Sequence, residues 1–275
     1  MKRHLSVFEL AARGAVYKTL AVSLWTAAVI FVLLWALPAG ALNLTDLLSG
    51  SYFSAEAENY VVTGGRYASY VFAAGLAALY VLLSRSGAPK RGVNPDYTWR
   101  RLRISERRAS LIQSGVHALC FAIYMAIVLA AFLAFAAIFL PRSGPYDNDG
   151  QTLFFAAFTT APLHAVLPLT EPLEWLAFAA TCLGGGVGTT AMAFWLRRGK
   201  TSALGVCLGI AIVLTQFQWA YGTGIRNILV FVVPVLTVGG LVSSFKSVSA
   251  ADYNAESAEG TDIRMTEGGG ADASA

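Results

Sequence analysis

The sequence predicts an all-α, polytopic membrane protein with six transmembrane helices. Hydrophobic residues make up 56% of its 275 residues, and charged residues make up only 13%, which is about half the charged fraction of an average soluble domain. The apolar residues form runs about as long as a bilayer is thick, and the basic residues gather between those runs. This pattern disfavours a soluble enzyme and a nucleic-acid-binding protein, because no polar face carries the net charge of +4.

The amino-terminal segment, residues 1–18, has the pattern of an amphipathic helix that lies in the plane of the membrane. On a helical wheel of residues 4–18, one side is apolar and carries Leu5, Phe8, Ala11, Ala12, Ala15 and Val16. The other side is polar and carries Lys2, Ser6, Glu9 and Arg13. A basic polar face opposite an apolar one is typical of helices at a membrane interface.

Six apolar runs are long enough to cross a bilayer, which takes about 20 residues in a helix. They are residues 20–37, 67–83, 114–140, 175–196, 203–221 and 228–245. Together they define an expected transmembrane domain over residues 19–246. The third run is longer than a crossing requires, so we expect that helix to tilt or to project beyond the headgroups.

A seventh apolar stretch, residues 153–169, does not read as a simple crossing. It contains Pro162, His164 and Pro168, and proline removes a backbone donor and disrupts the preceding helical turn. We expect a re-entrant or interfacial hairpin there, on the outer side of the membrane.

The basic residues predict the orientation of the helices. They stand before the first run (Lys2, Arg3, Arg13, Lys18), throughout residues 85–108, and after the fourth run (Arg197, Arg198, Lys200). The remaining connections are acidic or nearly neutral. Six crossings place every basic cluster in the cytoplasm, as the positive-inside rule requires, whereas a crossing by residues 153–169 would turn the last cluster outward. The sequence therefore predicts a plasma-membrane protein with both termini in the cytoplasm.

The last segment, residues 247–275, is rich in Ser, Ala, Gly, Asp and Glu and has almost no large apolar side chains. Such a segment cannot bury enough apolar surface to fold. We expect a disordered cytoplasmic tail.

No catalytic motif is present, so the sequence predicts no enzyme activity and no bound cofactor. HExxH and GxSxG sequences are absent, and ionisable residues are missing from the depth of the apolar runs. His164, Glu171 and Glu174 have no regular metal-ligand spacing. The cysteines Cys120, Cys182 and Cys207 have no CxxC spacing either, and they are expected to be small packing residues.

Four polar residues in the apolar runs are candidates to line a pathway. Gln113 and His117 are four residues apart, so they share one face at the cytoplasmic end of the third run. Either they line a pathway or they form a helix end wetted by the interface. Gln216 and Gln218, near the outer end of the fifth run, either hydrogen-bond across helices or line a vestibule.

Glycines at a spacing of four mark the fourth and fifth runs. Gly184 and Gly188 form one pair, and Gly205 and Gly209 form the other. GxxxG spacing allows two helix backbones to approach closely in a membrane. A phosphate-binding loop would also need a preceding strand and a following lysine, so we interpret these glycines as helix-packing residues.

The connection before the third run is the most informative segment. Ser105 is placed to cap a helix that continues into the third run. The basic residues around it suit either an anchor on anionic lipid or a docking surface for a cytoplasmic partner.

At this point the chain resembles the membrane subunits of ABC-2-type transporters. Residues Arg101-Leu102-Arg103-Ile104-Ser105 resemble the family pattern Arg-x-Leu-x-Ile-Ser between the second and third spans. The resemblance implies that a separate ATPase docks on this connection, at Arg100, Arg101, Arg103, Ser105, Arg107 and Arg108. It also implies that the subunit pairs with itself or with a sibling chain, and that residues 1–18 form the family's elbow helix.

The resemblance covers about the first 140 residues well and the remainder loosely. The family places its outer re-entrant helices between the fifth and sixth spans, where this chain has only the short connection 222–226. Two functions follow as hypotheses. One is an ATP-driven transport subunit, and the other is a membrane scaffold, sensor or immunity protein that transports nothing.

Overall fold

The computed structural model describes residues 2–36, 57–87, 106–139, 172–216, 231–240 and 242. These residues form helices and short turns, and no strand occurs among them. The labelled elements are α1 (Lys2–Ala36), α3 (Ala57–Ser84), the 3₁₀ turn η1 (Arg85–Gly87), α5 (Glu106–Phe139), α8 (Pro172–Arg197) and α9 (Ala203–Thr215). A further short helix covers Phe231–Gly240. The predicted all-α class is thus confirmed for the described residues.

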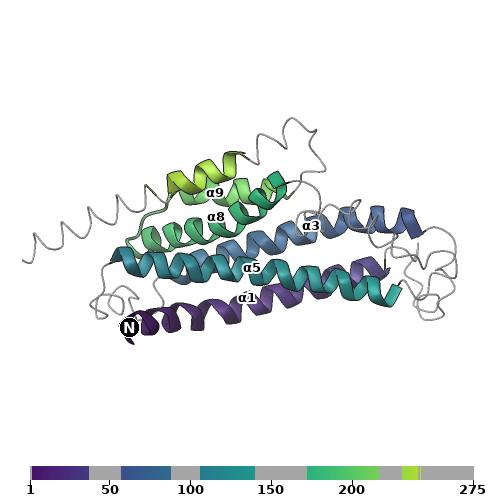
Figure 1. The fold of residues 1–275 in the computed structure, drawn as a ribbon, viewed down its shortest axis with the longest axis horizontal. Helices are drawn as coiled ribbons and strands as arrows, with labels where there is room; N and C mark the ends of the chain where they lie inside the picture. Colours follow the sequence, from purple (N-terminus) through teal and green to yellow (C-terminus); the bar gives the residue numbers. More distant parts are fainter. Residues whose placement is uncertain are drawn as a thin grey trace, which may run out of the picture.

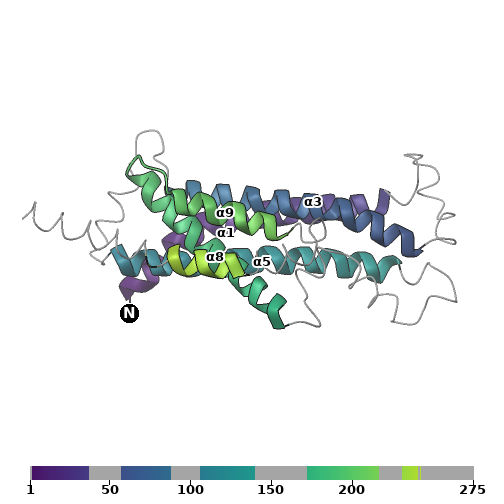
Figure 2. The same cartoon turned by 90° about the horizontal axis from the view of Figure 1, so that it is seen from above.

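Three long helices, α1, α3 and α5, lie side by side along the long axis of the molecule (Figures 1 and 2). The shorter helices α8 and α9 pack over the half of this layer that contains the N-terminus (Figure 1). Contacts between side chains give the directions. Lys18 of α1 reaches Leu82 at the end of α3, so α1 and α3 are antiparallel. Phe31 meets Phe135, which makes α1 and α5 parallel.

The remaining directions follow in the same way. Phe72 of α3 stacks on Tyr124 of α5, with ring centroids 5.6 Å apart. Gln113, near the start of α5, bonds to Ser86, just after the end of α3, so the two helices are antiparallel. His117 of α5 meets Thr189 of α8, which also runs antiparallel to α5. As a result, α5 ends and α8 begins toward the same end of the bundle.

Four helices are long and apolar enough to cross a membrane, judged by their length and composition. Their apolar windows are Ala11–Leu34, Tyr67–Ser84, Arg107–Phe135 and Trp175–Arg197. These windows overlap the first four expected spans. The helices Ala203–Thr215 and Phe231–Gly240 are shorter and represent only part of the fifth and sixth expected spans.

The first helix joins the two segments that the sequence distinguishes. An in-plane helix is expected over residues 1–18, leading directly into a span from residue 20. The helix α1 is one uninterrupted helix of 35 residues, and its apolar window begins at Ala11. No glycine or proline interrupts the chain between Ala15 and Ala36, so nothing in this stretch breaks the backbone hydrogen bonding near residue 18.

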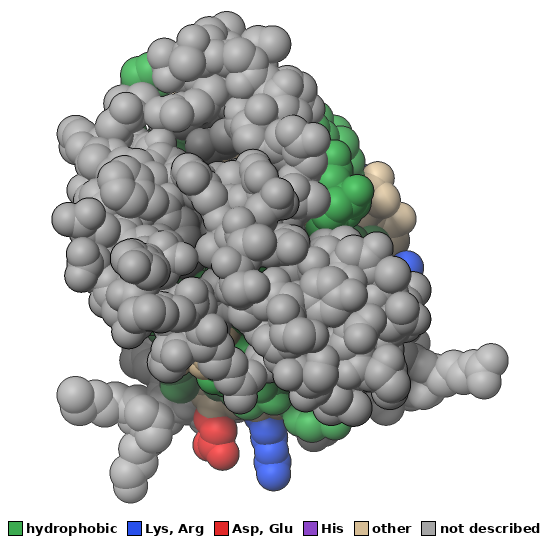
Figure 3. All heavy atoms as spheres, turned by 90° about the vertical axis from the view of Figure 1, so that its right-hand side faces the viewer, with side chains coloured by type: hydrophobic (Ala, Val, Ile, Leu, Met, Phe, Trp, Pro, Cys, Tyr) green, Lys and Arg blue, Asp and Glu red, His purple; other side chains and the backbone are tan. Residues whose placement is uncertain are grey.

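Large apolar side chains point outward along the helices. Trp25 is 74% exposed, Val235 69% and Leu24 60%. Figure 3, which looks along the bundle from the end opposite the N-terminus, shows apolar side chains on the flank where described helices are visible. Contiguous apolar surface of this kind is costly in water but suits a lipid environment.

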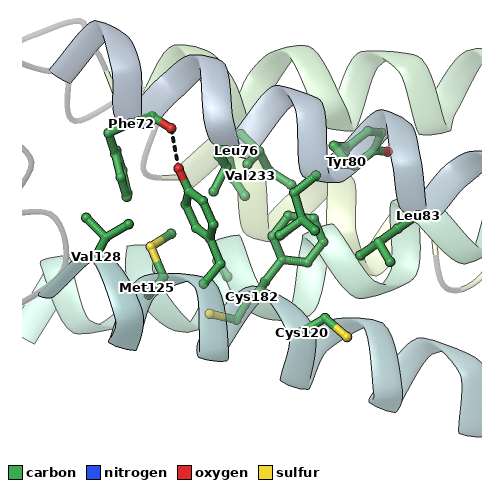
Figure 4. Close-up of a cluster of buried hydrophobic side chains, with 14 of the residues drawn as sticks. Phe72, Leu76, Tyr80, Leu83, Cys120, Met125, Val128, Cys182 and Val233 are labelled. Carbon is green, nitrogen blue, oxygen red and sulfur yellow. Dashed lines mark hydrogen bonds between the residues drawn. The ribbon is translucent and has the colours of Figure 1, made fainter. Parts of the chain in front are cut away.

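The centre of the bundle is packed with apolar and aromatic side chains from α3, α5 and α8 (Figure 4). The hydroxyl of Tyr124 donates a hydrogen bond of 2.7 Å to the carbonyl oxygen of Phe72, the dashed line in Figure 4. Cys120 and Cys182 are buried in this core, whereas Cys207 is exposed. The first two cysteines therefore occupy packing positions.

Several segments named from the sequence lie outside the described residues: the connection 88–105, the stretch 153–169 and the tail 247–275.

Candidate functional site

Basic side chains meet at the end of the bundle that contains the N-terminus. Because α1 and α5 start there and α3 and α8 finish there, residues far apart in the sequence are brought to one level. We call this the basic end, and its described cations are Arg13, Lys18, Arg85, Arg107, Arg108, Arg197, Arg198 and Lys200. The sequence separated these residues into three clusters, and the fold places the clusters together.

Gln113 connects three elements just inside the basic end. Its side chain is only 4% exposed. Its Oε1 accepts a hydrogen bond of 3.1 Å from Nη2 of Arg197 in α8. Its Nε2 donates a hydrogen bond of 3.3 Å to Oγ of Ser86 in η1. A buried amide that uses both of its ends fixes α5, α8 and η1 relative to one another.

His117 lies one turn deeper in α5 and is 1% exposed. Its Nδ1 is 2.9 Å from Oγ1 of Thr189. That hydroxyl also lies 2.6 Å from the carbonyl oxygen of Gly185, which can only accept. Since a hydroxyl has one proton, Thr189 donates to Gly185 and accepts from the imidazole. This assigns the Nδ1–H tautomer to His117.

The first helix adds a cation and two hydroxyl groups. Lys18 Nζ donates a hydrogen bond of 3.3 Å to the carbonyl oxygen of Leu82, near the end of α3. Thr19 and Ser23 are buried. Their hydroxyl groups donate hydrogen bonds to carbonyl oxygens one turn earlier in the same helix, at 2.9 and 2.7 Å. We call the set Lys18, Ser86, Gln113, His117, Thr189 and Arg197 the polar cluster.

Tyr80 explains two of the four glycines named from the sequence, Gly188 and Gly209. Its hydroxyl also donates a hydrogen bond of 2.5 Å to the carbonyl oxygen of Gly205 in α9, whereas a Cβ at Gly205 would meet Met192. A Cβ at Gly209 would lie 2.7 Å from the Tyr80 ring, and a Cβ at Gly188 would meet the Tyr80 hydroxyl. The glycines thus open a notch between α8 and α9 that accepts a tyrosine of α3.

The fourth glycine, Gly184, lies against the Phe231–Gly240 helix. A Cβ there would be 2.6 Å from Oγ1 of Thr237. The GxxxG pairs therefore bring α8 into contact with side chains of α3 and of the Phe231–Gly240 helix. They do so in addition to the packing of α8 on α9.

The expected docking residues are only partly within the described residues. Arg107 and Arg108 lie in the first turn of α5 and are exposed. Arg100, Arg101, Arg103 and Ser105 lie outside the described residues, although α5 begins directly after Ser105. The start of the helix is thus where a serine cap was expected.

Gln216, the described glutamine of the fifth run, is not brought to the polar cluster. Gln216 is buried at the end of α9, and its Nε2 donates to the carbonyl oxygen of Ile212 at 3.3 Å and to Thr215 Oγ1 at 3.0 Å. Its hydrogen bonds therefore run within its own helix. Gln218 lies outside the described residues.

Sequence reasoning found Gln113 and His117 but missed their partners. Thr189 reads as an ordinary small residue after a glycine run, and Ser86 reads as a residue of a loop. Arg197 was noticed only as a marker of orientation. Most buried polar side chains have a hydrogen-bond partner, so the pair Gln113 and His117 was itself the available signal that polar groups from other helices lie opposite.

Metal binding finds no support in the part of the chain that the structure describes. No group of three or more His, Cys, Asp or Glu side chains is close enough there to hold an ion. His164 and the side chains of Glu171 and Glu174 lie outside the described part.

Comparison of the whole chain with models of known protein families, with curated proteins and with solved structures finds no match.

Proposed function

We propose that this chain is a multi-pass protein of the plasma membrane, with six crossings and both termini in the cytoplasm. We propose further that it is the membrane subunit of an ATP-driven transporter of the ABC-2 kind. In this proposal a separate ATPase docks on the basic connection 88–105 and on the first turn of α5.

Membrane insertion is supported by two features that occur together. Apolar side chains such as Trp25 and Val235 face outward along the helices, while the cations named above gather at one end. An apolar belt bounded by a basic end is the arrangement that lipid and the positive-inside rule favour.

An even number of crossings is supported by the directions of α5 and α8. The two helices are antiparallel, so the chain leaves α5 and enters α8 toward the same side of the bundle. A single crossing by residues 153–169 would require α8 to start at the opposite side. The outer hairpin proposed for that stretch fits these directions.

The observation that carries the transport proposal is the continuity of α5. This helix runs without interruption from Glu106 to Phe139. It starts at the basic connection and passes Gln113 and His117, which bond to α8 and η1. A displacement imposed on the first turn by an ATPase would therefore move a rigid rod that is hydrogen-bonded to its neighbours.

Co-purification tests this proposal. The wild-type chain, isolated from its own membranes in mild detergent, is expected to retain an ATPase subunit. A variant in which Arg101, Arg103 and Arg107 are all replaced by Glu is expected to lose it, because charge reversal opposes an acidic docking surface. A matched control reverses the exposed Arg13, which lies on α1, and is expected to keep the ATPase. Failure of the wild type to retain any ATPase would refute the transport proposal.

A second function, a membrane scaffold or sensor that transports nothing, is favoured by one observation. The polar side chains of α5 are closed off, with Gln113 4% and His117 1% exposed, and both are bonded to side chains of α8. A buried, hydrogen-bonded network of this kind is typical of a static bundle. This function predicts that no ATPase co-purifies and that the Arg-to-Glu variant remains folded.

A further inference from the structure

We infer that the junction of η1 and the end of α8 binds the phosphate of an anionic phospholipid headgroup, through Arg85, Ser86 and Arg197. This inference rests on the membrane placement proposed above, but it does not depend on transport or on an ATPase.

The depth of these residues points to the headgroup layer. The apolar window of α3 ends at Ser84, directly before Arg85, and the apolar window of α8 ends at Arg197 itself. The window of α5 begins at Arg107, at the same end. Two helices, α3 and α8, therefore change from apolar to cationic at the level of Gln113, and α5 enters its apolar window from the same end. Such a change is expected where lipid phosphates lie beside a spanning helix.

The buried amide of Gln113 orients two phosphate donors at this level. It accepts a hydrogen bond from Nη2 of Arg197, and Nε of Arg197 donates to the carbonyl oxygen of Ala193 at 3.3 Å. These two bonds fix the plane of the guanidinium group. Gln113 also donates to Oγ of Ser86, so the proton of that exposed hydroxyl points away from Gln113. A guanidinium group and a hydroxyl held in this way suit phosphate oxygens.

The turn between α8 and α9 holds further charge beside this junction. Backbone hydrogen bonds from Gly199 to Leu196, 3.1 Å, and from Lys200 to Trp195, 2.9 Å, close the end of α8. Gly199 adopts a φ of 69°, which favours glycine. The Arg198 guanidinium carbon lies 4.1 Å from the centre of the Phe194 ring, which holds this exposed side chain against the helix. The turn is therefore an ordered cationic rim.

Lipid is favoured over an acidic protein as the ligand because of where the donors sit. Ser86 and Arg197 occupy the edge of the apolar windows, and their geometry is set by Gln113, which is buried among the helices. A soluble partner would have to enter the headgroup layer to reach them, whereas a lipid phosphate is already there.

Native mass spectrometry of the full chain tests the inference. The protein is released from detergent in the presence of dioctanoyl phosphatidylglycerol, dioctanoyl phosphatidylcholine or inorganic phosphate. Phosphatidylglycerol is expected to bind at least about tenfold more tightly than either of the other two probes. The variant Arg85→Gln is expected to weaken phosphatidylglycerol binding by about tenfold, and Ser86→Ala by about threefold, as the loss of one charged and one neutral hydrogen bond predicts.

The matched control is Arg13→Gln, which removes the same charge from an exposed position on α1 and is expected to leave binding unchanged. An equal loss in Arg13→Gln and Arg85→Gln would show that only total charge matters and would overturn the inference. Equal binding of phosphatidylcholine, or of inorganic phosphate alone, would also overturn it. None of these outcomes depends on an ATPase, so the inference and the transport proposal fail separately.

Discussion

The glycines of α5 and α8 occupy two kinds of environment, and a missing Cβ matters in only one of them. At Gly186 a Cβ would lie 2.5 Å from the carbonyl oxygen of Ser114 and 2.8 Å from the backbone nitrogen of Ala118. Backbone atoms cannot rotate out of the way as a side chain can. At Gly115 of α5, by contrast, a Cβ would meet nothing within 4 Å.

We therefore predict that Gly186→Ala destabilises the bundle by about 1–3 kcal/mol, the usual cost of overpacking. Gly115→Ala is the control and is expected to be neutral or stabilising by up to about 1 kcal/mol, because alanine favours a helix. Thermal unfolding in detergent micelles measures both variants. Equal midpoints for the two variants would contradict the close approach of α5 and α8.

The tautomer of His117 gives a second prediction at the scale of one residue. Because the Thr189 hydroxyl donates its hydrogen bond to the carbonyl oxygen of Gly185, the imidazole is expected to carry its proton on Nδ1. The ¹⁵N chemical shifts of a histidine-labelled sample report this directly, and His117→Gln identifies the signal among the chain's three histidines. A protonated Nε2 with a bare Nδ1 would mean that Thr189 donates to the ring instead.

At the scale of helices, the sequence predicts which segments are helical better than it predicts how they meet. The apolar runs 67–83 and 175–196 correspond closely to windows of α3 and α8, because length and composition alone decide whether a segment spans. The notch for Tyr80 could not be predicted in the same way. GxxxG spacing indicates a close contact, but nothing in the sequence says that the side chain filling it comes from a helix more than 100 residues away.

The first helix is continuous through the expected boundary between the in-plane helix and the first span. Lys18 stands at that boundary, directly before the apolar run. In the structure Lys18 is part of α1 and extends to a carbonyl oxygen near the end of α3. A long lysine side chain can reach a polar group while its stem covers apolar surface, so a charge within an apolar run need not end the helix.

Proline substitution tests the continuity of α1. Leu20→Pro is expected to destabilise the protein by about 3 kcal/mol, because proline removes a backbone hydrogen bond and clashes with the preceding turn. The control Leu20→Ala is expected to cost much less, since this side chain is 40% exposed. If a new helix began at residue 19 or 20, its first turn would accept proline, and the two variants would unfold at similar temperatures.

At the scale of the whole molecule, the directions of the helices bring separate basic clusters to one end. The positive-inside rule predicts that such clusters share one side of the membrane. It does not predict that Gln113 hydrogen-bonds to both Ser86 and Arg197 there. A rule about charge gives the side of the membrane but no distance between residues on that side. The gathering at one end was therefore predictable, and the polar cluster was not.

The most direct test of membrane placement is cysteine labelling in intact cells with a reagent that does not cross membranes. In the parent protein for this test, serine replaces Cys120, Cys182 and Cys207. A single cysteine is then introduced in one of two places. Lys200→Cys lies in the exposed turn of the basic end, and Thr160→Cys lies in the expected outer hairpin. The Thr160→Cys protein is expected to be labelled in intact cells, and the Lys200→Cys protein only after permeabilisation. Labelling of Lys200→Cys from outside, or of Thr160→Cys only from inside, would contradict this placement.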